Sequence, residues 1–182
     1  MSAILLALAG AAVAGAALVY VGAISGALTL DVGVGRRLRE LGPLEVAVAA
    51  RRERVWELLA LPYVAEQPPR ALAEKVQVLE RGADVVVAAH RTKLPLLTAV
   101  TVEAVGLAAP EALTFRLLRG PVPFVTERIE LQEVGDGTTV AYTGTLGTDF
   151  WLLGRAWGRL VARTWVRTVE RSLADVKAAA ER

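Results

Sequence analysis

Few side chains in this sequence combine a reactive type with a spacing that suits chemistry. The chain has no cysteine and one histidine, which excludes disulfide scaffolds, thiolate metal sites and cysteine nucleophiles. A lone imidazole also argues against a histidine metal site or a serine-type triad, because each needs imidazoles in a defined geometry. No phosphate loop or nucleophile elbow is present. The sequence therefore predicts no catalytic residue, no metal and no cofactor, and it favours a protein that is not an enzyme.

Three residues remain candidates for polar contacts. Tyr142 shares the strand phase of Val140, so its phenol should point inward, toward either a ligand group or water and backbone at the rim. Glu127 shares a phase with Ile129, but its strand is only beginning there, so we expect an exposed position at the mouth of the interior. His90 lies in a strand with two equally apolar faces, which leaves its direction open.

The N-terminal segment is apolar enough to cross a membrane. From Ser2 to Leu30 there is no charged side chain, and about 20 apolar residues span the hydrocarbon core as a helix. Arg36, Arg37 and Arg39 follow at once, which predicts a single pass through the cell membrane with the C-terminal side in the cytoplasm. A cleaved signal peptide and a buried core helix are the alternatives.

Glycine and proline residues after the apolar segment indicate where the chain divides into its parts. We predict a transmembrane helix over 1–30, a linker over 31–43 that ends at Gly42-Pro43, and one globular domain over 44–182. Within the domain a short helix follows the first strand, and turn residues such as Pro95 separate the later strands. The Gly135-Asp136-Gly137 connection predicts a hairpin. Strand-like runs cover 44–50, 74–81, 83–91, 97–105, 111–119, 125–134 and 138–146.

The last part of the chain, from Phe150 onward, has helical periodicity. An apolar row recurs every four residues, at Leu153, Trp157, Val161, Trp165, Val169 and Leu173. An arginine row has the same spacing, at Arg155, Arg159, Arg163, Arg167 and Arg171. The two rows lie about 200° apart on a helix. We expect the arginine row to be a solvated face, with acidic sheet residues or anionic headgroups as other partners.

Three stretches carry a resemblance to a known family. Residues 46–59 look like an opening strand and helix, 127–142 like a penultimate hairpin, and the helix from Phe150 like a closing helix. Over about 44–180 the chain resembles the START-like (SRPBCC) superfamily of polyketide cyclase and lipid-transport-type domains. The resemblance implies an α+β helix-grip fold, in which a curved antiparallel sheet wraps around a long C-terminal helix, here preceded by one N-terminal transmembrane helix. The superfamily contains binders, carriers and some enzymes, so the fold assigns no function by itself.

The resemblance also implies an apolar cavity between the sheet and the long helix. Strand phases that exclude charged residues should face this cavity, and the opposite phases, which hold Glu103 among others, should face water. The interior is either such a pocket or a dry core; we expect the pocket. The predicted ligand-binding residues are Val100, Val102, Phe115, Leu117, Ile129, Tyr142, Trp157, Val161 and Trp165.

The composition and net charge reduce the number of function classes that fit the sequence. A formal net charge of +2 argues against a nucleic-acid binder, and the wealth of Ala, Arg, Leu and Val hints at a GC-rich bacterial genome. We expect a membrane-anchored binding or carrier domain for a hydrophobic small molecule or lipid. An accessory subunit of a larger membrane complex is the first alternative. A cyclase or dehydratase that uses Tyr142 or Glu127 is the second.

Overall fold

The structure, a computed structural model, describes residues 2–94 and 97–182, within which there are four helices and seven strands. Pro95, expected to mark a turn, lies outside the described residues. In chain order the elements are α1 (Ser2–Ile24), β1 (Arg37–Val48), α2 (Arg52–Val64), α3 (Arg70–Ala73), β2 (Val76–Arg81), β3 (Val85–Lys93), β4 (Thr98–Ala108), β5 (Ala112–Arg119), β6 (Phe124–Val134), β7 (Gly137–Thr148) and α4 (Trp151–Ala180).

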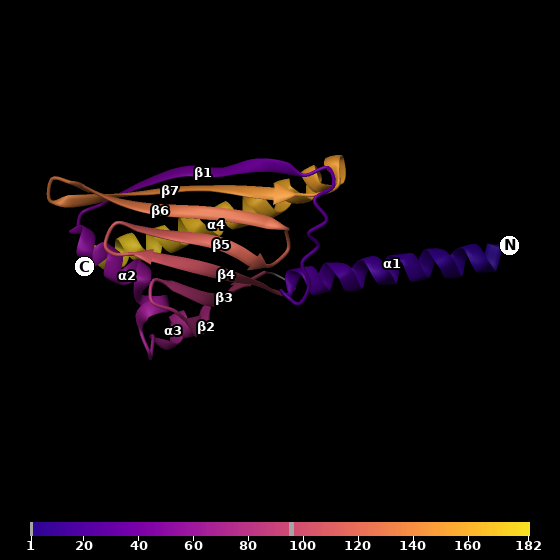
Figure 1. Cartoon of the computed structure of the whole chain (residues 1–182), viewed down its shortest axis with the longest axis horizontal. Helices are drawn as coiled ribbons and strands as arrows, with labels where there is room; N and C mark the ends of the chain where they lie inside the picture. The colour runs from indigo at the N-terminus through magenta and orange to yellow at the C-terminus, as the bar shows by residue number, and fades with distance from the viewer. Residues whose placement is uncertain (1, 95–96) are drawn as a thin grey trace.

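The seven strands form one antiparallel sheet in the order β1-β7-β6-β5-β4-β3-β2 (Figure 1). Strands that follow one another in the chain are neighbours, apart from β1, which pairs with β7. The predicted antiparallel sheet is therefore confirmed. The hairpin predicted at 135–137 joins β6 to β7, and Gly135 takes a φ of +60°, a left-handed conformation that favours glycine.

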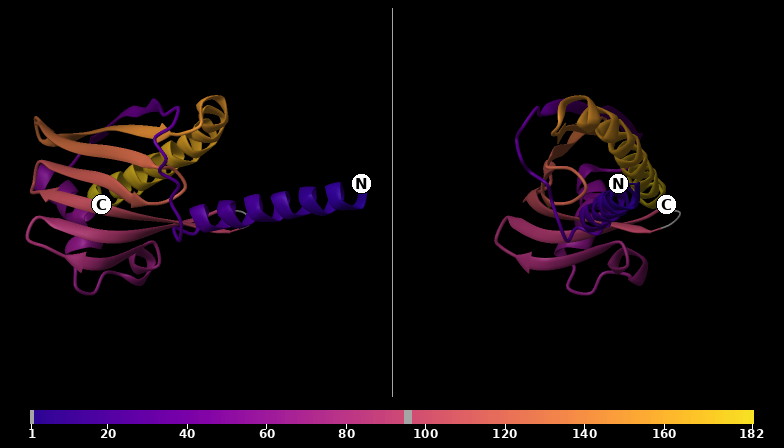
Figure 2. Two further views of the ribbon diagram at one scale, coloured as in Figure 1. Left: turned by 45° about the vertical axis from the view of Figure 1, so that its right-hand side comes forward. Right: turned by 90° about the vertical axis from the view of Figure 1, so that its right-hand side faces the viewer.

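Helix α4 lies across the concave face of the curved sheet (Figures 1 and 2). Val161 and Leu173 on this helix are buried in one core cluster with Leu113 and Leu146 from the sheet. The burial follows the apolar row of the sequence, because residues four apart share a helix face. Leu153, the first member of that row, departs from the pattern and is exposed. The predicted α+β arrangement of a curved sheet around a long C-terminal helix is confirmed.

Helix α1 leaves the end of the domain at which α4 begins and projects away from it (Figure 1). Among the described residues it is the one helix long and apolar enough to cross a membrane, over Ile4–Ile24. It ends sooner than the predicted span of 1–30. Its last turns touch the domain, because Ile24 is buried and the Tyr20 ring meets Trp157 edge-on at 5.6 Å between ring centres.

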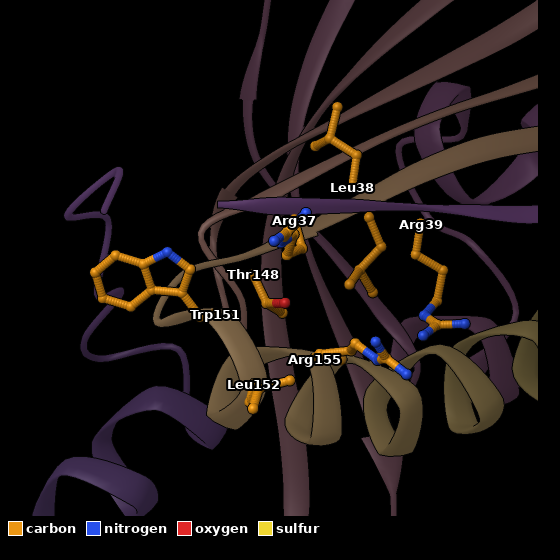
Figure 3. Close-up of a pocket in the computed structure, with 9 residues that line it drawn as sticks. Arg37, Leu38, Arg39, Thr148, Trp151, Leu152 and Arg155 are labelled. Atoms are coloured by element: carbon orange, nitrogen blue, oxygen red, sulfur yellow. The ribbon is translucent and has the colours of Figure 1, made fainter. Parts of the chain in front are cut away.

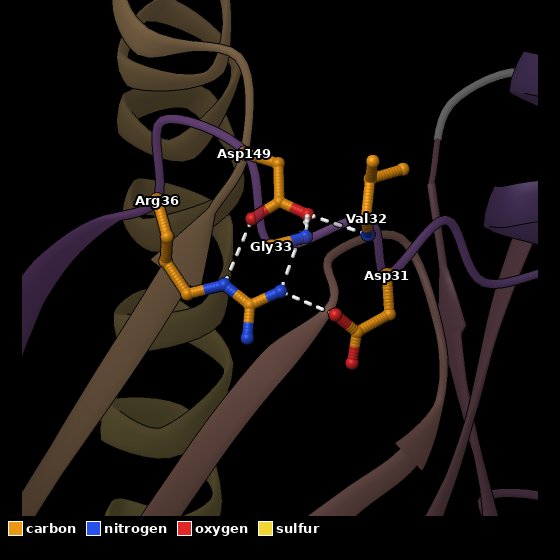
Figure 4. A network of polar contacts seen from close by, with 5 residues as sticks. All are labelled: Asp31, Val32, Gly33, Arg36 and Asp149. Carbon is orange, nitrogen blue, oxygen red and sulfur yellow. Dashed lines mark hydrogen bonds and ion pairs between the residues drawn. The ribbon is translucent and has the colours of Figure 1, made fainter.

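A charged clamp ties the segment after α1 to the start of α4 (Figure 4). The buried Asp149 carboxylate accepts hydrogen bonds from the backbone N–H groups of Val32 and Gly33, each at 2.8 Å. It also accepts one from Arg36 Nε at 2.8 Å, and Arg36 in turn pairs with Asp31. The Arg36 bonds, with those of the backbone, lower the pKa of Asp149 to about 2. The clamp is therefore charged at neutral pH and fixes how α1 joins the domain.

Strand β1 begins earlier than the run predicted from Leu44. It starts at Arg37 and pairs along β7 from Thr148 onward, so it overlaps the range 31–43 that was predicted as a linker. Gly42-Pro43 falls where the pairing shifts register between Leu41 and Leu44. A glycine-proline pair inside a strand is tolerated at such a bulge. The division into domains stays a prediction.

Candidate functional site

A cavity of about 470 Å³ lies between α4 and the concave face of the sheet. Tyr20 and Ile24, at the end of α1, line it at the side where the helix leaves the domain. Most of the wall is aliphatic or aromatic, which suits an apolar ligand. Six of the predicted ligand-binding residues line it: Phe115, Ile129, Tyr142, Trp157, Val161 and Trp165.

The other three predicted residues lie outside this lining. Leu117 is buried in the core cluster, while strand β4 presents Thr101 and Glu103 to the cavity instead of Val100 and Val102. Because side chains alternate along a strand, the two valines point to the opposite face. The predicted phase of β4 is wrong, since it assumed that a charged residue must face water. Glu103 is only 5% exposed.

The first polar group of the cavity is Glu127 on β6. Glu127 is only 9% exposed, so the prediction that it occupies an exposed position at the mouth of the cavity is wrong. The Tyr142 hydroxyl donates to Glu127 Oε1 at 2.7 Å, and Trp165 Nε1 donates to the same oxygen at 2.8 Å. Tyr142 thus points inward, as expected. Among the residues that the structure describes, none donates to Oε2, which leaves this oxygen to face the cavity.

Burial and, to a smaller extent, the negative charge of Glu103 raise the pKa of Glu127 to about 7. The hydrogen bonds from Tyr142 and Trp165 and the charge of His90 act in the opposite direction but do not cancel the effect. Near neutral pH this carboxyl therefore exists both as an acid and as a carboxylate. A proton on Oε2 leaves both hydrogen bonds to Oε1 in place.

The second polar group is a chain of four side chains from α2, β3 and β4. His90 Nδ1 lies 3.0 Å from Glu103 Oε2, and the Tyr63 hydroxyl lies 3.0 Å from His90 Nε2. Thr101 donates to Glu103 Oε1 at 2.6 Å. All four side chains line the cavity. We call this set, Tyr63, His90, Thr101 and Glu103, the histidine relay.

The two acids of the cavity carry different charges because their partners differ. Burial by itself would raise the pKa of Glu103, but the charge of His90 and hydrogen bonds from His90 and Thr101 hold it below its usual value. Burial likewise opposes the charge on His90, yet the Glu103 carboxylate raises the His90 pKa. Each of these two groups therefore favours the charged form of the other, whereas no cation among residues 2–94 and 97–182 pairs directly with Glu127.

The histidine relay is hard to predict from the sequence. His90 lies in a run whose two strand phases are equally apolar, and Tyr63 lies in a separate helix, so no spacing links them. The one usable signal was that Thr101 and Glu103 share a strand phase, which also fits a solvated face. Phe115 lies on β5, the strand between β4 and β6. Its ring meets the rings of Tyr63 and His90 edge-on, with 6.1 and 6.4 Å between ring centroids.

Chemically, the cavity combines an apolar wall with two distinct polar positions. Glu127 can accept a hydrogen bond or a proton, or donate one, at the free Oε2. The histidine relay offers a hydroxyl and an imidazole held in place by a carboxylate. Neighbouring titratable groups whose environments move their pKa values apart are the usual arrangement of acid and base in a catalytic site. The same groups can also orient a bound molecule without chemistry.

The sequence matches no protein-family model and no curated protein. Solved structures share its fold. The ZhuI aromatase/cyclase from Streptomyces sp. R1128 has a TM-score of 0.64 and 22% identity, over 81% of this chain and 94% of that one. Norcoclaurine synthase from Thalictrum flavum has a TM-score of 0.58 and 14% identity, over 79% of this chain and 85% of that one.

A di-domain ARO/CYC protein, BexL from the BE-7585A biosynthetic pathway, is also similar. Its TM-score is 0.59 at 19% identity, and the match covers 81% of this chain and 51% of that one. These likenesses show the fold. The chain has the helix-grip fold that its resemblance to the START-like (SRPBCC) superfamily implied.

Proposed function

We propose that the domain binds a hydrophobic small molecule or lipid that carries one polar group, and that α1 anchors it in a membrane. The observation that carries the proposal is the apolar cavity of about 470 Å³ in which Glu127 Oε2 is free. The apolar part of the ligand would replace water along the wall, which is favourable by roughly 25 cal/mol per Å² buried. Its polar group would bond to Oε2, because an unpaired carboxyl is costly in such a site.

The position of α1 supports a ligand drawn from the bilayer. Tyr20 and Ile24 belong both to the candidate membrane span and to the cavity wall. A ligand leaving the lipid at this end would pass from one apolar surface to another. The arginines that follow α1 favour a domain on the cytoplasmic side of the cell membrane.

Photolabelling tests this proposal directly. The full chain in nanodiscs is exposed to a diazirine analogue of hexadecanol, and the labelled peptides are identified by mass spectrometry. We expect labels on cavity residues of β6 and α4 in addition to labels on α1. Wild-type protein labelled on α1 alone would contradict the proposal, because the probe would then stay in the lipid.

Two blocking variants and one matched control sharpen the result. Ile129→Trp and Val161→Phe fill the cavity from opposite walls, and Val134→Trp introduces tryptophan at an exposed position of the same strand, β6. Cavity labels should disappear in both blocking variants and persist in the control.

The alternative function, an accessory subunit of a larger membrane complex, is tested by gentle detergent extraction followed by co-purification. A carrier should be recovered alone, whereas an accessory subunit should be recovered with its complex.

General acid–base catalysis is the second candidate function. It is favoured by the Glu127 pKa of about 7, since a catalytic group works best when its pKa is near the working pH. The probe is 2-undecanone in D₂O, whose carbons next to the carbonyl exchange hydrogen for deuterium when a base removes a proton. Exchange catalysed by the wild type and lost in Glu127→Gln would support catalysis. Equal exchange in both proteins would leave binding as the function.

A further inference from the structure

The end of the domain from which α1 leaves exposes large apolar side chains outside the cavity. At the start of α4, Trp151 is 55% exposed, Leu152 75% and Leu153 80%. Phe150 is also exposed, at 43%. Clusters of this kind are uncommon on a surface that meets only water. They lie on the side of the domain toward which α1 extends (Figure 2).

The backbone holds this cluster in a strained conformation. Phe150 and Trp151 have φ values of 68° and 48°, in the left-handed region that non-glycine residues seldom adopt. Their N–H groups donate to the carbonyl oxygens of Val34 and Gly35, at 2.8 and 3.2 Å. Together with the Asp149 clamp, these bonds keep two aromatic side chains at the surface. Strain that the surrounding contacts maintain at an exposed position points to a function for that position.

Guanidinium groups border the same cluster. A hollow of about 520 Å³ between β1 and α4 is lined by Arg37, Arg39 and Arg155 together with Trp151 and Leu152 (Figure 3). Of the carboxylates that the structure describes, none pairs with these three arginines. The hollow therefore combines positive charge with an apolar floor, which matches a lipid headgroup above an acyl chain.

We propose that this surface docks onto the leaflet of an anionic bilayer beside the inserted α1. The docking face consists of Phe150, Trp151, Leu152 and Leu153 with Arg37, Arg39 and Arg155. The apolar side chains enter the acyl boundary, Trp151 lies at headgroup level as tryptophans do at membrane interfaces, and the arginines bind lipid phosphates. Because the Asp149 clamp fixes the connection between α1 and the domain, a single orientation of the domain allows α1 to be inserted and the docking face to contact the bilayer.

Lipid is the partner that fits the docking face, because the docking face lies next to the candidate membrane span. A bilayer crossed by α1 must lie at this end of the domain, at the level where α1 joins it (Figure 1). Docking requires α1 to be inserted, but it does not depend on any ligand in the cavity. Its failure and the failure of photolabelling in the cavity are therefore separate results.

The absence of natural cysteine makes the test simple. Leu153→Cys carries a nitroxide label in full-length chain reconstituted into nanodiscs of phosphatidylcholine and phosphatidylglycerol. Val134→Cys is the matched control, since Val134 is also exposed, at 63%, and lies in the β6–β7 hairpin at the opposite end (Figure 1). We expect relaxation by a water-soluble nickel chelate to be about tenfold weaker at 153 than at 134, because polar solutes are excluded from the acyl region.

Equal chelate access at 153 and 134 would overturn the proposal. So would chelate access at a label on Leu8→Cys, because docking requires inserted α1. The triple variant Arg37→Gln, Arg39→Gln, Arg155→Gln tests the role of the positive charge. We expect it to increase chelate access at position 153 severalfold on the anionic discs but not on discs of phosphatidylcholine alone. No change on anionic discs would overturn the role of the arginines and with it the anionic partner.

Discussion

Two glutamates face the same cavity, and their surroundings shift their pKa values in opposite directions. Glu103 on β4 is held by His90 and Thr101, and its pKa lies below the usual value. Glu127 on β6 is as deeply placed, but its partners are the neutral donors Tyr142 and Trp165, and its pKa rises to about 7. Burial alone therefore does not decide the charge of a carboxyl here; a cationic partner does. One acid is a fixed ion, and the other can change its charge near neutral pH.

The largest expected effect on stability comes from removing the imidazole of His90, the cationic partner of Glu103. His90→Leu leaves the Glu103 carboxylate buried without its partner, which should lower the free energy of unfolding by about 3–5 kcal/mol at pH 7. The loss should shrink at pH 4, because Glu103 without the imidazole is then protonated. Urea unfolding of the full chain in mild detergent, followed by tryptophan fluorescence, measures both values.

Glu103→Gln serves as its matched control. It removes the carboxylate together with the need for a cation, so its cost should be smaller than that of His90→Leu. A similar cost for the two variants at both pH values would show that the relay is held by packing and not by charge.

The next effect concerns the pH dependence of stability. The folded-state pKa of Glu127, about 7, lies above its usual 4.5, so the folded protein binds this proton more tightly than the unfolded chain. The resulting stability is complete below about pH 4.5 and is lost as the pH rises through 7, by on the order of 3 kcal/mol. Glu127→Gln cannot titrate and resembles the protonated acid, with an oxygen for both donors.

The variant should therefore match the wild type at pH 4 and be more stable at pH 8. Thermal or urea unfolding at these two pH values is the measurement, and the difference between the proteins isolates Glu127 from the histidine relay. Parallel stability profiles would mean that the pKa of Glu127 is the same in the folded and unfolded protein, so that burial does not raise it.

The smallest effect comes from Tyr142→Phe. Loss of the hydroxyl removes one of the two donors to Oε1, which should cost about 1 kcal/mol at pH 5. The pKa of Glu127 should rise, because this hydrogen bond lowers it. Tyr63→Phe is the control, since its hydroxyl lies against His90 and makes no hydrogen bond to Glu127. A shift of the Glu127 pKa in the control alone would reverse the assignment of partners.

Much of the fold could be predicted from the sequence, since it rests on long periodic patterns. The row from Trp157 to Leu173 identified α4, and Gly135-Asp136-Gly137 identified a hairpin, because each pattern is local. The site depends on contacts between distant elements. Six predicted residues do line the cavity, since apolar alternation marks an inward face.

The polar part of the site was missed for a physical reason. Glu103 was assigned to the solvated face because a charged residue is seldom buried unless it is paired. Its partner His90 lies on the neighbouring strand and Tyr63 on a helix, and no spacing reveals such a pairing. Leu153 shows the opposite error, since an apolar residue in phase with the core is exposed where the helix extends past the sheet.

The most direct measurement is the titration of the two acids by NMR. Full-length chain labelled with ¹³C at glutamate carboxyls is followed from acid to alkaline pH, and Glu103→Gln and Glu127→Gln each remove one signal for assignment. We predict that Glu127 titrates near 7 and that Glu103 titrates below 4.5. If both carboxyls titrate together near 4.5, the cavity holds no acid that changes charge at neutral pH, and the account of its polar end is wrong.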